Sequence, residues 1–122
     1  MIELIEGLPA GVVGIEAKGE VRGEDYETVV IPAVEAALEG HDKVRLLYVL
    51  GSEFEGYSAA AMWDDTKVGM KHLTSWDRIA LVTDNETYGR LVKGFGFLMP
   101  AEVKIFGVAD LGEAKGWIAE GL

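Results

Sequence analysis

The chain has 122 residues, 49% hydrophobic and 26% charged, so it can bury one continuous core and is too apolar to be disordered. Its 21 acidic and 11 basic residues give a formal net charge of −10, which repels phosphate backbones and excludes nucleic acid as an expected partner. It has no cysteine, so disulfides and thiolate metal sites are excluded, and no apolar run approaches the roughly 20 residues of a transmembrane helix. We expect one cytoplasmic domain spanning residues 1–122.

The chain opens with two segments in which apolar and polar residues alternate, 2–6 and 12–18, separated by a turn that contains glycine and proline. This pattern predicts a hairpin of half-buried strands, the first of them an antiparallel edge. Residues 24–39 then repeat apolar positions every three or four residues, which predicts an amphipathic helix. Pro32 lies inside that pattern and predicts either a kink or a first helical turn near Ile31.

Three further apolar strand segments alternate with three helical segments. The strands are expected at 44–50, 78–83 and 103–108, and the helices at 57–73, 85–97 and 111–120. The order β-β-α-β-α-β-α-β-α predicts a single α/β domain with one mixed, mostly parallel sheet of about five strands. Thr83 with Glu86, and Asp110 with Glu113, have the spacing of a capping box at the last two helix starts.

Short motifs in a fixed order cover nearly the whole chain. They are Glu24-Asp25-Tyr26, Pro32-Ala33-Val34-Glu35, Lys43-Val44-Arg45-Leu46-Leu47, Phe54-Glu55-Gly56-Tyr57, Trp63-Asp64-Asp65 with Gly69 and His72, Arg78-Ile79-Ala80-Leu81-Val82-Thr83-Asp84, Pro100-Ala101-Glu102-Val103-Lys104-Ile105-Phe106, and Glu113-Ala114 with Trp117 and Ile118. Together they resemble the SpoIIAA-like family, small proteins related in fold to STAS-domain anti-sigma-factor antagonists and similar in fold to CRAL-TRIO lipid-binding domains. The resemblance implies a SpoIIAA/STAS-like fold and brings no known chemistry.

STAS relatives are switched by phosphorylation of a serine where the helix after the third strand begins, and Ser58 lies near that place. The Asp-Ser-(Ser/Thr/Ala)-Gly signature of the phosphorylated antagonists is absent, because the loop here reads Gly-Ser-Glu-Phe-Glu-Gly-Tyr-Ser over residues 51–58. The resemblance therefore makes Ser58 a candidate phosphorylation site without the motif that usually marks one.

The segment expected to be a helix at 57–73 carries apolar residues on two opposite faces, whereas a surface helix needs only one. The second face packs in the core, meets a dimer partner or covers an apolar, lipid-like ligand, and the sequence leaves these interpretations open. Methionine and tryptophan on such a helix are adaptable contact residues. The residues assigned to ligand or partner binding are Phe54, Tyr57, Met62, Trp63 and Met70.

Ser58, Asp65 and His72 are the residue types of a hydrolase triad and share one flank of that expected helix. Seven helical residues separate neighbours by roughly 10 Å along the axis, whereas a triad needs hydrogen-bond contact of about 3 Å. No metal-ligand spacing occurs either. We therefore expect no catalytic residues, metal or cofactor, and a non-catalytic binding or regulatory module. The alternative is a protein–protein regulatory domain of the anti-sigma-factor-antagonist type, switched near Ser58.

Overall fold

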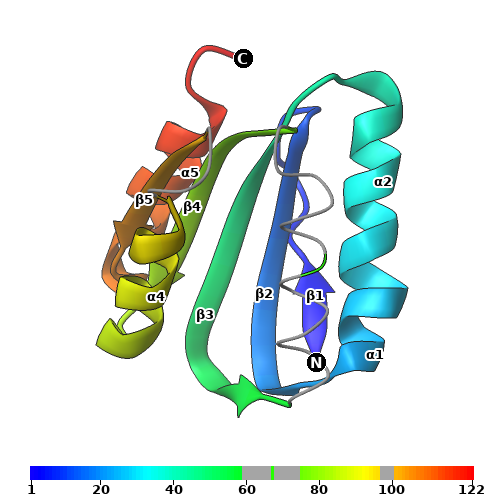
Figure 1. The fold of residues 1–122 in the computed structure, drawn as a ribbon. Helices are drawn as coiled ribbons and strands as arrows, with labels where there is room; N and C mark the ends of the chain where they lie inside the picture. The colour runs from blue at the N-terminus through cyan, green and yellow to red at the C-terminus, as the bar shows by residue number, and fades with distance from the viewer. Residues whose placement is uncertain (59–66, 68–74, 97–100) are drawn as a thin grey trace.

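The computed structural model describes residues 1–58, 67, 75–96 and 101–122, and its centre is a five-stranded sheet in the order β1-β2-β3-β4-β5 (Figure 1). β1 pairs antiparallel with β2, and every later pair is parallel, so the predicted mixed sheet with an antiparallel edge is confirmed. The strands are β1 (Ile2–Leu4), β2 (Val12–Val21), β3 (Val44–Tyr57), β4 (Trp76–Thr83) and β5 (Glu102–Phe106). The helical elements are α1 (Gly23–Asp25), η1 (Tyr26–Val30), α2 (Ile31–Gly40), α4 (Glu86–Gly96), η2 (Val108–Asp110) and α5 (Leu111–Ala119).

The two faces of the sheet bury separate hydrophobic clusters. One cluster joins β2, β3 and β4 to η1 and α2, and half-buried side chains of α4 pack against it. The other joins β3, β4 and β5 to α5, with Ile5 and Leu8 of the β1–β2 turn at its margin. A Cβ added at Gly14 would collide with the side chain of Leu8, so glycine at this position lets the turn lie on the sheet. The candidate site described below belongs to the first face.

Helical structure runs without a break from Gly23 to Gly40, although the sequence places Pro32 inside it. The turn before the proline, η1, is a π-helix in which the Ile31 N–H donates to the Tyr26 carbonyl. α2 then begins at Ile31, which puts Pro32 in its first turn. Because η1 precedes α2 without a break, the wider π turn is where the helix accommodates the N–H that proline lacks. The expected first turn near Ile31 is confirmed, and the wider π turn precedes it.

β3 is longer than the sequence indicated. It continues past Leu50 to Tyr57. Among the described residues, its partner beyond Leu50 is the carboxyl end of β2, where Gly19 lies opposite Phe54 and Val21 opposite Tyr57. The prediction of a helix beginning at Tyr57 is therefore wrong, because this residue completes a strand. Ser58 follows the strand without helical structure, and Lys67 is helical and exposed; the rest of the predicted 57–73 helix lies outside the described residues.

Two expected capping boxes are absent. The side chain of Asn85 accepts hydrogen bonds from the N–H groups of Thr87 and Tyr88, so Asn85 caps α4 and Thr83 does not. Thr83 instead accepts the N–H of Asn85 at 3.0 Å. Asp110 makes no side-chain capping bond to α5, which follows directly from the 3₁₀ turn η2.

Candidate functional site

Three aromatic rings meet where the extension of β3 passes the first turn of α4. The ring centroids of Phe54 and Tyr57 lie 5.0 Å apart, and each lies 5.5 Å from the centroid of Tyr88. The interplanar angles of 60°, 70° and 74° are edge-to-face geometries, which the ring quadrupoles favour. All three rings are half-buried and pack against the first hydrophobic cluster. We call these three residues the aromatic cluster.

The backbone between Phe54 and Tyr57 explains how two rings three positions apart reach the same place. In a regular strand, residues three apart point to opposite faces. Here the register with β2 shifts next to Gly19, and Gly56 has a φ of +138°, a value that side chains rarely allow. The irregular strand therefore turns both rings toward Tyr88.

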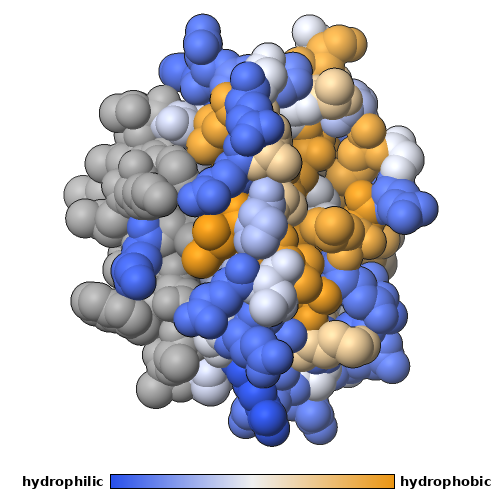
Figure 2. Space-filling model, turned by 90° about the vertical axis from the view of Figure 1, so that its right-hand side faces the viewer, coloured by the Kyte–Doolittle hydropathy of each residue, from blue (hydrophilic) through white to orange (hydrophobic). Residues whose placement is uncertain are grey.

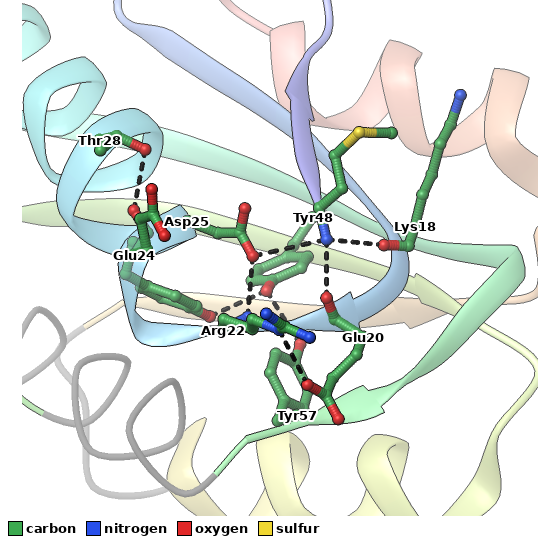
Figure 3. Close-up of polar contacts among 10 residues, drawn as sticks. Lys18, Glu20, Arg22, Glu24, Asp25, Thr28, Tyr48 and Tyr57 are labelled. Atoms are coloured by element: carbon green, nitrogen blue, oxygen red, sulfur yellow. Dashed lines mark hydrogen bonds and ion pairs between the residues drawn. The ribbon is translucent and has the colours of Figure 1, made fainter.

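A string of tyrosine hydroxyls connects the aromatic cluster to the core. The Tyr57 hydroxyl donates to the Tyr48 hydroxyl at 2.9 Å, and the Tyr48 and Tyr26 hydroxyls lie 2.8 Å apart. Tyr26 and Tyr48 are only 1% and 7% exposed, whereas Tyr57 is half-buried. Figure 3 shows the rings of Tyr48 and Tyr57 with their hydroxyls turned toward each other. These hydrogen bonds connect η1, the middle of β3 and the end of β3.

A polar depression of about 700 Å³ opens nearby, at the carboxyl end of β2. It is lined by Met1, Lys18, Gly19, Glu20, Arg22, Asp25, Glu53 and Glu55. The ammonium group of Met1 donates to the carbonyls of Lys18 at 2.8 Å and Glu20 at 2.7 Å, and lies 3.4 Å from the Asp25 carboxylate (Figure 3). The Asp25 carboxylate also accepts the N–H of Arg22. These contacts fasten the start of the chain to α1.

Lys18 lies between two carboxylates on the sheet face opposite the aromatic cluster. Its Nζ is 3.1 Å from Glu3 Oε2 and 3.7 Å from Glu53 Oε2. The hydrogen bond that the Lys18 ammonium donates to Glu3, followed by the negative charge of the same carboxylate, raises the pKa of Lys18 above its ordinary value. Lys18 therefore stays charged into the alkaline range.

The structure brings together Phe54 and Tyr57 of the residues assigned from sequence. Ser58 follows β3 directly, and its N–H donates to the Val21 carbonyl at 2.8 Å. The other assigned residues, Met62, Trp63 and Met70, lie outside the described residues, as do Asp65 and His72.

Tyr26, Tyr48 and Tyr88 could not be assigned to a site from the sequence. Tyr88 lies in the helical segment expected at 85–97, and Tyr48 lies in the apolar strand segment expected at 44–50. The sequence feature that could have indicated these residues is the tyrosine hydroxyl, because a tyrosine buried in such a segment needs a hydrogen-bond partner. Within the described ranges, no group of three or more histidine, aspartate or glutamate side chains could hold a metal ion. No helix in those ranges is long and apolar enough to cross a membrane.

A mixed five-stranded sheet with α2 and α4 on one face and α5 on the other defines the class of fold. The SpoIIAA-like family model matches residues 12–119, and the chain belongs to that family. It is similar to the crystal structure of an uncharacterized protein of the DUF3478 family with a SpoIIAA-like fold from Shewanella loihica PV-4. The identity is 29%, the TM-score is 0.74, and the match covers 97% of this chain and 92% of the other. A comparison with curated proteins finds no match.

Proposed function

We propose that the protein is a non-catalytic binding module of the cytoplasm, in which the aromatic cluster of Phe54, Tyr57 and Tyr88 forms part of the wall around an apolar, lipid-like ligand. The observation that carries this proposal is the mutual edge-to-face contact of three rings that all remain half-buried. Aromatic side chains present a large apolar area, and burying it against a ligand contributes about 25 cal/mol per Å². The absence of cysteine fits a reducing compartment.

The tyrosine hydroxyls support the same function. Ligand sites combine mostly apolar walls with a few placed polar groups that orient the ligand. Tyr57 contributes its ring to the aromatic cluster and its hydroxyl to the bond with Tyr48, so apolar and polar groups adjoin in one residue. Ring contacts with Phe54 and Tyr88 and the hydrogen bond to Tyr48 together fix the position of Tyr57, so this part of the wall is formed before a ligand binds.

Native mass spectrometry of the protein purified from its own cells tests the proposal. We expect a mass above that of the bare chain that disappears on denaturation. Tyr88→Ala should lower the fraction that carries this mass, whereas Leu91→Ala, at a position 55% exposed on the same helix, should not. A bare monomer would contradict the proposal. A bare homodimer would contradict it too, and would favour the dimer interpretation of the apolar residues.

The position of Ser58 favours a second function, a protein–protein regulatory domain of the anti-sigma-factor-antagonist type switched at this serine. Ser58 is bonded to the Val21 carbonyl, next to Arg22, whose side chain is 72% exposed and 3.1 Å from Glu20. A phosphate on Ser58 would add negative charge at the end of β3, which is bonded to the residue that precedes Arg22, so this exposed guanidinium is a candidate partner for the phosphate. Intact-mass measurement should then reveal a phosphorylated species that Ser58→Ala lacks. Its absence under every growth condition would contradict this second function.

A further inference from the structure

The edge strand β1 leaves part of its backbone without a partner strand. In an antiparallel ladder, alternate residues direct their N–H and C=O groups toward the neighbouring strand. The Ile5 N–H donates to the Gly14 carbonyl of β2 at 2.8 Å, so odd-numbered residues turn inward. The backbone groups of Ile2 and Leu4 therefore point away from the sheet. In the part of the chain that the structure describes, no strand lies beyond them.

The side chains along this edge are more apolar than those of the other edge. Leu4 is 54% exposed and Met1 51% exposed, whereas β5 carries the exposed charges of Glu102 and Lys104. Charged side chains are a common protection of sheet edges against pairing with other chains. Figure 2 shows a broad apolar area beside a column of mostly hydrophilic residues on the side of the molecule that carries α2. The β5 edge is thus protected by charge, and the β1 edge offers apolar contact.

Glu3 determines which strand this edge accepts. Leu4 shares a sheet face with the buried Ile2, and Glu3 lies on the opposite face, where its side chain is 50% exposed. Glu3 is already paired with Lys18, but it shares that lysine with Glu16 and Glu53, so the surroundings of Glu3 stay negative. An incoming basic residue opposite Glu3 therefore forms a favourable cross-strand pair, and an acidic one is repelled. The net charge of −10 adds long-range attraction for a basic partner.

The same charge disfavours a second copy of this chain. An antiparallel pairing of two β1 strands along their whole length places Ile2 opposite Leu4 and Glu3 opposite Glu3. Like charges directly opposite each other destabilise a strand pair, and the two chains also repel through their net charge. A basic segment of a different protein therefore suits the edge better.

We propose that the outer edge of β1 binds an extended segment of a basic partner protein by strand addition, with an apolar side chain beside Leu4 and a lysine or arginine opposite Glu3. Main-chain bonds to Ile2 and Leu4 supply affinity, and alternating side chains supply specificity. A strand of three residues offers few such bonds, so the contact is weak and reversible. This surface is separate from the aromatic cluster and does not depend on it.

Titration of ¹⁵N-labelled protein with two capped pentapeptides, Thr-Val-Lys-Val-Thr and Thr-Val-Glu-Val-Thr, tests the proposal. We expect the amide signals of Ile2 and Leu4 to shift with the lysine peptide, and the glutamate peptide to bind about five-fold more weakly. Glu3→Lys should reverse this preference. Leu4→Pro removes an outward N–H without touching the ladder to β2 and should abolish binding, whereas Leu4→Val should retain it.

Amide spectra of the unbound variants first verify that each one is folded. Equal responses to the two peptides, or unchanged Ile2 and Leu4 signals at millimolar peptide, would overturn the proposal. Self-association of the wild-type protein through the β1 amides would overturn it as well, because a second copy would then occupy the edge.

Discussion

The hydroxyl of Tyr57 donates a hydrogen bond to the hydroxyl of Tyr48 at 2.9 Å, which joins the half-buried end of β3 to its buried middle. Tyr57→Phe keeps the ring and removes this bond, so we expect it to lower the free energy of unfolding by about 1 kcal/mol. Tyr48→Phe removes the hydroxyl that both Tyr57 and Tyr26 contact, and should cost about 2 kcal/mol. Urea unfolding of both variants measures the difference. Equal losses of unfolding free energy would show that the Tyr48 hydroxyl does not connect the other two hydroxyls.

Arg45 holds the end of α5 on the sheet. Its Nε donates to Asp77 at 2.8 Å, and its Nη1 donates to the carbonyls of Ile118 at 3.0 Å and Glu120 at 2.6 Å. Those carbonyls lie at a helix end, where no intrahelical donor reaches them. We expect Arg45→Leu to lower the free energy of unfolding by about 3 kcal/mol, because it leaves several acceptors unsatisfied.

Arg45→Lys should fall between the wild type and Arg45→Leu, since one ammonium cannot reproduce the fork of donors. The matched control is Arg22→Leu, at a side chain that is 72% exposed, and it should change stability by less than about 0.5 kcal/mol. Urea unfolding gives all three values. A similar loss at both arginines would contradict the role assigned to Arg45.

The pair of Glu3 and Lys18 predicts a pH dependence in the alkaline range. The pKa of Lys18 is raised in the folded protein, chiefly by its hydrogen bond to Glu3. The stabilisation is therefore complete below the pKa of the unfolded chain, and it is lost as the pH rises through the higher folded pKa. Glu3→Gln should lower the pKa of Lys18 measured by NMR titration of its side chain, and Glu53→Gln should lower it less. Identical titration in all three proteins would contradict this assignment.

Asn85 caps α4 and thereby positions Tyr88. Its side-chain oxygen accepts from the N–H groups of Thr87 at 3.0 Å and Tyr88 at 3.2 Å. We expect Asn85→Ala to lower the free energy of unfolding by about 1 kcal/mol, and Asn85→Asp to preserve it, because aspartate accepts the same bonds. Thermal unfolding monitored by circular dichroism provides the comparison. If Asn85→Asp were as destabilised as Asn85→Ala, the capping role would be wrong.

The order of strands and helices could be predicted because alternation, helical periodicity and apolar runs are local patterns. The extension of β3 to Tyr57 could not, because residues 51–57 are stabilised by the carboxyl end of β2, which is distant in sequence. Their acids and glycines also suggest a loop when considered alone. The meeting of Phe54 with Tyr57 depends on that extension and on the φ of Gly56.

The hydrogen-bond partners of the buried tyrosines could not be predicted from the sequence either. Tyr26 belonged to an amphipathic helical pattern and Tyr48 to an apolar strand, and neither pattern indicates which side chains meet across a sheet and a helix. The caps show a similar limit. Thr83 with Glu86 has capping-box spacing, but β4 continues through Thr83, so the helix start moves on to Asn85.

The most direct test of the binding function is aromatic NMR of protein labelled at phenylalanine and tyrosine, titrated with 1-decanol. This probe is apolar and uncharged, so the net charge of −10 does not repel it, and four phenylalanines and four tyrosines give a simple spectrum. We expect the ring signals of Phe54, Tyr57 and Tyr88 to shift, and the signal of Phe106, buried on the opposite sheet face, to stay in place. Unchanged signals of the aromatic cluster up to the solubility limit of 1-decanol would contradict the proposed function, and so would a uniform shift of every ring.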